Sequence, residues 1–148
     1  MATLDHPHWE TVSPLLRRVL ETVGRQPFAS RFYLAGGTAL ALQLGHRVSI
    51  DLDFFSDSDE LESASRQEII TALGQKFPIE VDEGGLASLL INIQGSYAGF
   101  FGYSYPLLAP TYTLAGIRLA GMLDIGFLSK WSRARRPSNI RSALSICA

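Results

Sequence analysis

The chain is poor in several features that would otherwise narrow its class. It has one cysteine, Cys147, which excludes an intrachain disulfide framework. No stretch reaches the roughly 18 uninterrupted apolar residues of a membrane-spanning helix. The N-terminus, MATLDHPHWE, lacks the basic segment followed by an apolar segment that marks a secretory signal. We therefore expect a cytoplasmic protein that does not associate with a membrane.

Acidic residues are also absent from one part of the chain. From residue 129 onward there is no Asp or Glu, whereas the whole chain has 14 of them and 13 Lys and Arg. The cations of this segment are Lys130, Arg133, Arg135, Arg136 and Arg141. Subtracting these five from 13 leaves eight cations against 14 acids in residues 1–128, a net charge of −6. Basic tails often contact nucleic acid. Because its composition differs from the rest of the chain, we treat 129–148 as a basic, atypical tail and 1–128 as the domain.

The rest of the sequence predicts one small mixed domain. With 148 residues, of which 47% are hydrophobic, the chain can bury a real core, and we find no internal repeat and no interdomain linker. Residue patterns predict helices over 8–23, 38–44, 61–77 and 121–128, strands over 32–35, 50–55, 78–82, 86–93, 97–103 and 117–120, and a loop bracketed by Pro106 and Pro110. This order predicts an α/β or α+β fold with a mixed sheet.

The segment FYLAGGTALALQLGHRVSIDLDFFS, residues 32–56, carries the chemistry. Side chains alternate along a strand, so Asp51 and Asp53 point to one face while Leu52 points to the other. Two adjacent carboxylates repel unless a cation lies between them, and oxygen ligands of this kind suit a divalent metal. A solvated pair at a strand end is the simpler alternative. The apolar neighbours, such as Ile50 and Phe54, argue instead for a buried strand with a polar patch.

A glycine turn precedes the helix predicted after the first strand. Gly36 and Gly37 allow close approach of a ligand to the backbone, and the N–H groups at the start of a helix attract phosphate. The alternative is a tight strand-to-helix turn in which Thr38 caps the helix, and the two readings are compatible. Arg47 suits either a phosphate contact or a surface ion pair. Ser49 suits a structural or a functional hydroxyl equally.

These residues resemble the AbiEii/AbiGii toxin family of nucleotidyltransferases, within the polymerase-beta-like superfamily. The family signature is a Gly-Gly-Thr or Gly-Ser turn, about a dozen residues, and then Asp-x-Asp. Residues 36–38 and 51–53 match this signature, and the approach Gly45 to Ser49 is also typical. The resemblance runs from about Trp9 to Leu128. It implies a polymerase-beta-like core with a mixed sheet flanked by helices.

The resemblance also implies an activity and partners. Relatives transfer a nucleoside monophosphate from an NTP to an acceptor, for some of them tRNA, and act as toxins of toxin–antitoxin or phage-defence modules. Here Asp51 and Asp53 would be catalytic and would hold Mg²⁺. Gly36, Gly37 and Thr38 would cradle the triphosphate, and the other predicted nucleotide-binding residues are Arg47 and Ser49. An antitoxin protein would be a partner.

The chain departs from the family pattern in two places. The superfamily usually adds a third carboxylate on a later strand, but the corresponding residues 97–103 have no acid, and only Glu80 or Asp82 on the preceding strand could substitute. The tail 129–148 also lacks the Lys-Asp and Asp-Leu elements of the family. A frameshift near Leu128, giving a truncated chain, or a divergent tail would explain this.

Two principal hypotheses follow from the sequence. The chain is either an Mg²⁺-dependent nucleotidyltransferase toxin or a catalytically silent, truncated relative that binds nucleotide or a protein partner. A less favoured third is a nucleotidyltransferase that modifies a small molecule such as an antibiotic. The acceptor would separate the first from the third, and nothing in the sequence names it.

Overall fold

The computed structural model describes residues 2–82, 85–102, 107 and 111–121. The described part contains three α-helices, two 3-10 helices and one eight-stranded sheet. The helical elements are η1 (Trp9–Thr11), α1 (Pro14–Gly24), η2 (Pro27–Arg31), α2 (Gly36–Leu44) and α3 (Ser63–Gly74). The strands are β1 (Ala2–Thr3), β2 (Tyr33–Ala35), β3 (Leu52–Phe55), β4 (Glu80–Asp82), β5 (Ser88–Ile93), β6 (Ser96–Phe101), β7 (Tyr112–Leu114) and β8 (Ile117–Leu119).

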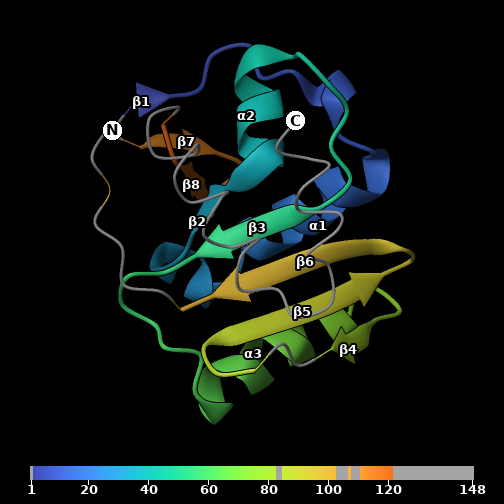
Figure 1. Ribbon diagram of the computed structural model, residues 1–148, viewed down its shortest axis with the longest axis vertical. Helices are drawn as coiled ribbons and strands as arrows, with labels where there is room; N and C mark the ends of the chain where they lie inside the picture. Colours follow the sequence, from blue (N-terminus) through green and yellow to red (C-terminus); the bar gives the residue numbers. More distant parts are fainter. Residues whose placement is uncertain (1, 83–84, 103–106, 108–110, 122–148) are drawn as a thin grey trace.

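The sheet is mixed, as the sequence predicts. Its strand order is β1-β7-β8-β2-β3-β6-β5-β4 (Figure 1). Strand β3 lies in the middle, antiparallel to β2 and parallel to β6. The hairpin β5–β6 and the strand β4 extend the sheet on one side, and β8, β7 and β1 extend it on the other. This arrangement confirms the α/β (α+β) fold class.

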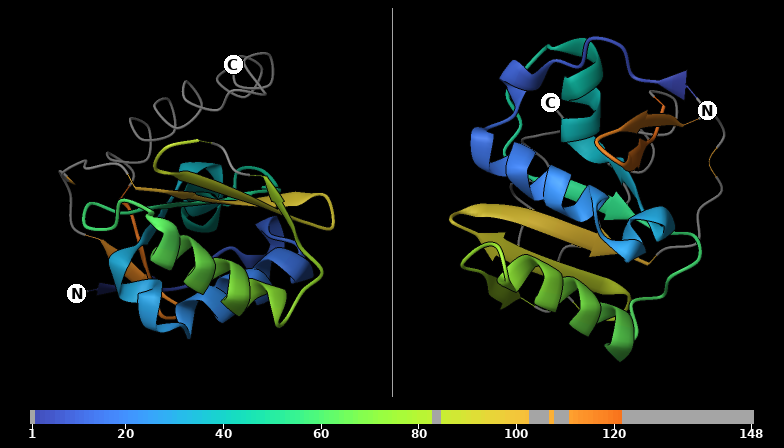
Figure 2. Two further views of the ribbon diagram at one scale, coloured as in Figure 1. Left: turned by 90° about the horizontal axis from the view of Figure 1, so that it is seen from below. Right: turned by 180° about the vertical axis from the view of Figure 1, so that it is seen from behind.

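Helices α1 and α3 lie side by side on one face of the sheet (Figure 2, right). Helix α1 begins where the sequence provides a start, because Ser13 Oγ accepts a hydrogen bond from the N–H of Leu16 and Pro14 occupies the first turn. Its apolar stripe is buried against the sheet, with Val19 and Leu20 both 0% exposed. The fully buried rings of Phe28, Phe32, Phe54 and Phe100 form the centre of the core.

Several predicted boundaries and one burial are wrong. The helix predicted over 8–23 is instead the short helix η1 followed by α1, because Ser13 caps a new helix that begins at Pro14. The strand predicted from Ile50 starts at Leu52, and Ile50 is 67% exposed rather than buried. Strands β1 and β7 were not predicted, and β7 lies between the predicted loop and the strand predicted over 117–120. Most of the predicted helix 121–128, the residues 103–106 and the tail 129–148 lie outside the described residues.

The fold brings the two halves of the glycine–aspartate signature together. Helix α2 follows β2 with no intervening loop, and β2 pairs with β3 so that Ala35 lies opposite Asp53. The start of α2 is therefore beside the strand that carries the acidic pair. No helix in the described part of the chain is long and apolar enough to cross a bilayer.

Candidate active site

Gly36 and Asp53 are in contact where β2 turns into α2. Gly36 has a φ of +71°, which residues with a side chain rarely adopt. A β-carbon at this position would lie 2.6 Å from Oδ2 of Asp53 and 3.3 Å from its Cγ. The absence of a side chain at Gly36 therefore gives the Asp53 carboxylate its room beside the first turn of α2.

Asp51 is held from two sides. Its Oδ1 accepts a hydrogen bond of 2.9 Å from the backbone N–H of Tyr97, the second residue of β6. Its carbonyl oxygen accepts a hydrogen bond from the Thr38 hydroxyl on α2. Both Asp51 and Asp53 are half-buried, whereas Leu52 between them is fully buried. The two acids therefore lie at the boundary between core and solvent, and one oxygen of Asp51 is oriented by backbone.

Thr38 and Ser49 form a buried hydroxyl pair behind the acidic strand. Their Oγ atoms are 2.5 Å apart, and the residues are 1% and 9% exposed. Because the Thr38 proton goes to the Asp51 carbonyl, the Ser49 hydroxyl is the donor in this pair. The Ser49 N–H in turn donates to the carbonyl of Thr11 at 2.8 Å. Both hydroxyls thus tie the segment before β3 to α2, a contact made inside the protein.

Arg47 extends over the start of α2. A β-carbon on Gly37 would overlap its guanidinium and would lie 3.9 Å from the Ser49 Oγ. Within the described residues the Arg47 side chain forms no ion pair. The N-terminus of α2 has no side-chain cap, since Ala35 occupies that position. A helix N-terminus carries about half a positive charge, so a guanidinium beside it is favourable only with an anion nearby. The Asp53 carboxylate, beside Gly36 in the same turn, is one such anion.

The arrangement joins two complementary parts. Asp51 and Asp53 offer carboxylate oxygens, which are the ligands that Mg²⁺ prefers. The N-terminus of α2 and Arg47 offer N–H donors and positive charge, which suit phosphate. Because Gly36 has no side chain, the Asp53 carboxylate lies directly against the first turn of α2, which brings the two parts together. The donor set thus fits a magnesium-bound nucleotide.

A third carboxylate does not join the acidic pair within the described residues. On the neighbouring strand β6, the residue paired with Asp53 is Gly99. Glu80 and Asp82 lie on β4, three strands away from β3 in the order β3-β6-β5-β4, or about 14 Å at the usual strand spacing. They are exposed at the sheet edge and cannot complete this site. In the described part of the chain no three His, Cys, Asp or Glu side chains form a metal-binding group.

One contact of the site was not predicted from the sequence. The donor to Asp51 is a backbone N–H at residue 97, and a backbone group leaves no signal in side-chain patterns. Only the register of the parallel β3–β6 pair, in which Leu52 lies opposite Ala98, places that N–H beside Asp51.

Comparisons with known proteins agree with this geometry. A family model described as "Nucleotidyl transferase AbiEii toxin, Type IV TA system" matches residues 18–145. The chain is similar to the uncharacterized protein aq_aa25 of Aquifex aeolicus (strain VF5), with 37% identity over 125 residues. The match covers 82% of this chain and 59% of that protein, so the chain spans less than two thirds of its relative.

Solved structures of nucleotidyltransferases share the fold. JHP933 from Helicobacter pylori has a TM-score of 0.51 and 18% identity, with 80% of this chain and 54% of that chain covered. ANT(2")-Ia, solved in complex with adenylyl-2"-tobramycin, has a TM-score of 0.50 and 17% identity, with 83% of this chain and 76% of that chain covered. At such identities the likeness concerns the fold.

Proposed function

Because this chain belongs to the AbiEii nucleotidyl transferase toxin family, whose model matches residues 18–145, we propose that it transfers a nucleoside monophosphate from an NTP to RNA. The reaction depends on Mg²⁺, and tRNA is the first acceptor to test. The protein acts in the cytoplasm as the toxin of a toxin–antitoxin pair.

One observation carries this proposal: the Asp53 carboxylate, two residues from Asp51, lies directly beside the N-terminus of α2, where the N-cap residue Ala35 provides no capping side chain. Asp53 is in contact with Gly36, and Arg47 lies over Gly37 in the same turn. A carboxylate pair alone would suit many cations, and a helix start alone would suit many anions. Their proximity favours a ligand that has both, a polyphosphate with its divalent metal.

The proposed roles follow from these positions. Asp51 and Asp53 would hold Mg²⁺, which would supply charge neutralisation on the phosphates. The N–H groups of Gly36 and Gly37 and the Arg47 guanidinium would bind the triphosphate. Thr38 and Ser49 would act on Asp51 through its backbone carbonyl, because their hydroxyls are already engaged there.

The proposed transfer needs no reactant other than the NTP and the RNA. A hydroxyl oxygen of the RNA forms a bond to the α-phosphorus of the NTP, and the bond from that phosphorus to the bridging oxygen of the β-phosphate breaks. Pyrophosphate leaves with the electron pair of the broken bond, and the hydroxyl proton passes to water. The role of the protein is to place the NTP and to stabilise negative charge on its phosphates.

The test is transfer of label from each of the four α-³²P NTPs to total RNA, with and without Mg²⁺. We expect Mg²⁺-dependent labelling that Asp53→Asn abolishes. Asp57→Asn is the matched control, because Asp57 is an exposed residue just after β3 and should leave labelling unchanged. No labelling of RNA with any NTP would contradict the proposal.

The same experiment separates the alternatives. A catalytically silent relative would bind Mg²⁺ and NTP in calorimetry yet label nothing. A small-molecule nucleotidyltransferase would label an aminoglycoside and not RNA, an arm worth including because the structure of ANT(2")-Ia shares the fold.

A further inference from the structure

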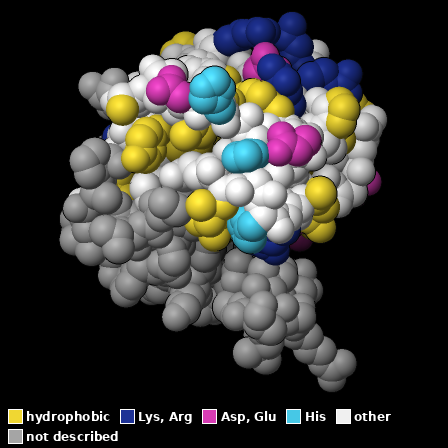
Figure 3. All heavy atoms as spheres, turned by 90° about the horizontal axis from the view of Figure 1, so that it is seen from above, with side chains coloured by type: hydrophobic (Ala, Val, Ile, Leu, Met, Phe, Trp, Pro, Cys, Tyr) yellow, Lys and Arg dark blue, Asp and Glu magenta, His cyan; other side chains and the backbone are white. Residues whose placement is uncertain are grey.

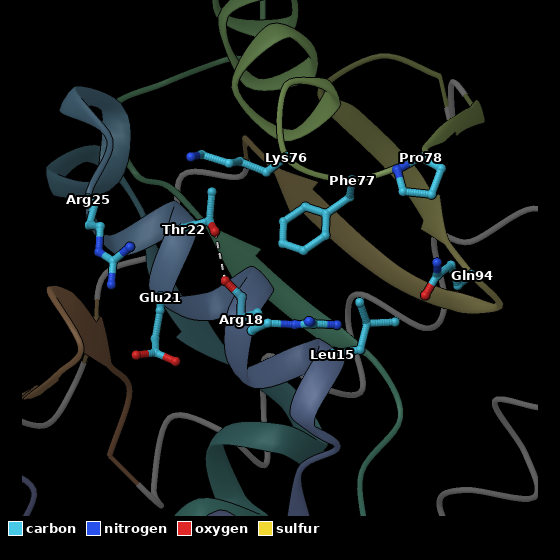
Figure 4. Close-up of a pocket in the computed structure, with 9 residues that line it drawn as sticks. All are labelled: Leu15, Arg18, Glu21, Thr22, Arg25, Lys76, Phe77, Pro78 and Gln94. Atoms are coloured by element: carbon cyan, nitrogen blue, oxygen red, sulfur yellow. Dashed lines mark hydrogen bonds between the residues drawn. The ribbon is translucent and has the colours of Figure 1, made fainter.

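A basic groove lies between α1 and the end of α3, on the helical face of the sheet. Figure 4 shows Arg18 and Arg25 of the α1 segment on one side and Lys76, after α3, on the other. The groove has a volume of about 370 Å³. Its other lining residues are Leu15, Glu21, Thr22, Phe77, Pro78 and Gln94. None of the residues of the candidate active site lines it.

The positive charge of this groove is not balanced locally. Its one acid, Glu21, pairs with Arg17, whose Nε lies 3.6 Å from the carboxylate. Arg18, Arg25 and Lys76 form no ion pair among the described residues. All three are exposed. Residues 1–128 have only eight cations against 14 acids. Three of those eight therefore line one groove of a domain that is otherwise acidic.

Helix dipoles explain only part of this charge. Arg25 is the C-cap of α1, and Lys76 follows the C-cap of α3, where a cation is favourable. The two helix ends together contribute about one negative charge, half a charge each. Three side-chain cations exceed that amount, and Arg18 lies in the middle of α1, away from either end.

The floor of the groove is apolar. The ring of Phe77 faces the groove between Lys76 and Pro78, with Leu15 opposite (Figure 4). Thr22 donates its hydroxyl proton to the Arg18 carbonyl at 2.8 Å, so the α1 side offers cations rather than free hydroxyls. Gln94 adds a carboxamide from the β5–β6 turn. An aromatic face flanked by cations is the combination that binds single-stranded nucleic acid.

We propose that this groove binds a single-stranded segment of RNA. Phosphates lie on Arg18, Arg25 and Lys76, and one base stacks on Phe77. The groove is then a docking surface separate from the acidic pair. The proposal takes RNA from the proposed function, but the binding it describes requires neither NTP nor Mg²⁺.

An acidic peptide fits the groove less well. An extended peptide gains affinity by pairing with a free strand edge, and the groove is lined by helix α1 with its C-cap, the connection between α3 and β4, and the β5–β6 turn. A peptide helix needs a long apolar channel, whereas the floor here is limited to Leu15, Phe77 and Pro78. The two cations of the α1 segment, Arg18 and Arg25, are seven residues apart, or about 10 Å along the helix axis. Figure 3 shows that most of the Lys and Arg side chains on the face it presents gather along one border of the molecule.

The test measures binding of a fluorescent single-stranded RNA decamer by anisotropy over a range of salt concentrations, without NTP or Mg²⁺. Three phosphate contacts predict a slope of log K against log salt of about −2, at roughly −0.7 per contact. The double variant Arg18→Gln, Lys76→Gln should reduce this slope to about −0.7. Phe77→Leu keeps an apolar side chain but removes the ring face, and should lower affinity about 5-fold or more.

Arg118→Gln is the control away from the groove. Arg118 donates to the carbonyl of Ser30 at 3.3 Å and lies over the Tyr33 ring, with 5.9 Å from its Cζ to the ring centroid, and it does not line the groove. Circular dichroism checks that each variant is folded. Equal losses for Arg118→Gln and for the double variant would overturn the proposal, because they would indicate a diffuse charge effect. Unchanged binding in the double variant would overturn the proposal as well, since RNA binding would then be assigned to the basic segment 129–148 and not to the groove.

Two further outcomes separate this proposal from its alternatives. A poly-glutamate peptide that competes as well as unlabelled RNA would identify an acidic-protein site and overturn the RNA assignment. Asp53→Asn should bind the decamer like the unaltered protein while losing RNA labelling. If the unaltered protein binds the decamer but labels no RNA, the proposed function alone is contradicted. If it labels RNA but its decamer binding does not respond to the groove variants, the groove alone is contradicted.

Discussion

Replacing Gly36 by alanine tests how the start of α2 makes room for the acidic strand. Gly36 has a φ of +71°, so alanine must adopt a left-handed backbone or rotate the peptide. Its β-carbon would also lie 2.6 Å from Asp53 Oδ2, much closer than van der Waals contact. The atom that must move is part of the carboxylate proposed to bind metal. The substitution should therefore lower both stability and metal affinity.

The size of the stability loss follows from two terms. A left-handed residue with a β-carbon costs about 1–2 kcal/mol. Turning the Asp53 side chain away from its preferred rotamer adds about 0.5–1.5 kcal/mol. The reduced freedom of the unfolded chain offsets about 0.4–1 kcal/mol. The net loss is about 0.5–3 kcal/mol, which at roughly 2–4 °C per kcal/mol lowers the melting temperature by about 1–12 °C.

Two other glycines separate these terms. Gly95 has a φ of +92° with nothing within 4 Å of an added β-carbon, so Gly95→Ala measures the backbone term alone. Gly37 does not have a positive φ, and its β-carbon would meet chiefly the guanidinium of Arg47, which can move. Gly37→Ala should therefore be the mildest of the three, and Gly36→Ala the most damaging.

The assay is thermal unfolding by circular dichroism together with Mn²⁺ binding by electron paramagnetic resonance. We expect Gly36→Ala to weaken Mn²⁺ binding. Gly95→Ala should lower the melting temperature but leave Mn²⁺ binding unchanged. The reasoning is refuted if Gly36→Ala melts at the same temperature as the unaltered protein. It is also refuted if Gly37→Ala is the more destabilising of the two.

Three further predictions concern stability, each measured by chemical or thermal unfolding. Phe100→Ala should cost about 3–5 kcal/mol, because this fully buried ring packs against three other phenylalanine rings; a cost below about 1 kcal/mol would contradict that packing. Asp59→Ala should cost about 1–3 kcal/mol, because it removes the acceptor of a buried N–H and the partner of Arg31 at 3.0 Å; a neutral effect would show those bonds to be replaceable by water. The pKa of the Glu10 carboxyl lies below its usual range because of a backbone hydrogen bond first and the His8 side chain second. A carboxyl whose pKa is lower in the folded protein stabilises the fold at neutral pH, and this contribution is lost as the pH falls through that lowered pKa. Glu10→Gln should therefore lower the melting temperature at pH 7 but not in acid.

The elements around the glycine–aspartate signature could be predicted because their signals are local. A short apolar run ended by Gly36 predicts a strand, and the structure has β2 at Tyr33–Ala35. Helix formers up to Gly45 predict a helix, and α2 ends at Leu44 with Gly45 in the left-handed conformation. Each feature depends on residues within a few positions of one another, which sequence patterns record.

Other features depend on distant partners and left no such signal. Strand β7 forms because Tyr112–Leu114 pairs with β8 and β1, although the nearby prolines favour a loop. Ile50 reads as part of an apolar strand, yet the pairing with β2 begins only at Asp53 and leaves its side chain in solvent. In both cases the neighbour in space, not the neighbour in sequence, decides the structure.

The hydrogen bond from Tyr97 to Asp51 also orders events during synthesis. Its partners are 46 residues apart, and α3, β4 and β5 must be made between them. At about 5–20 residues per second, translation of that interval takes roughly 2–9 s. During this time β2 and β3 are already synthesised, but the Asp51 carboxylate lacks its backbone donor. In a nascent chain, Asp51 therefore gains its hydrogen bond from Tyr97 only after β6 has left the ribosome.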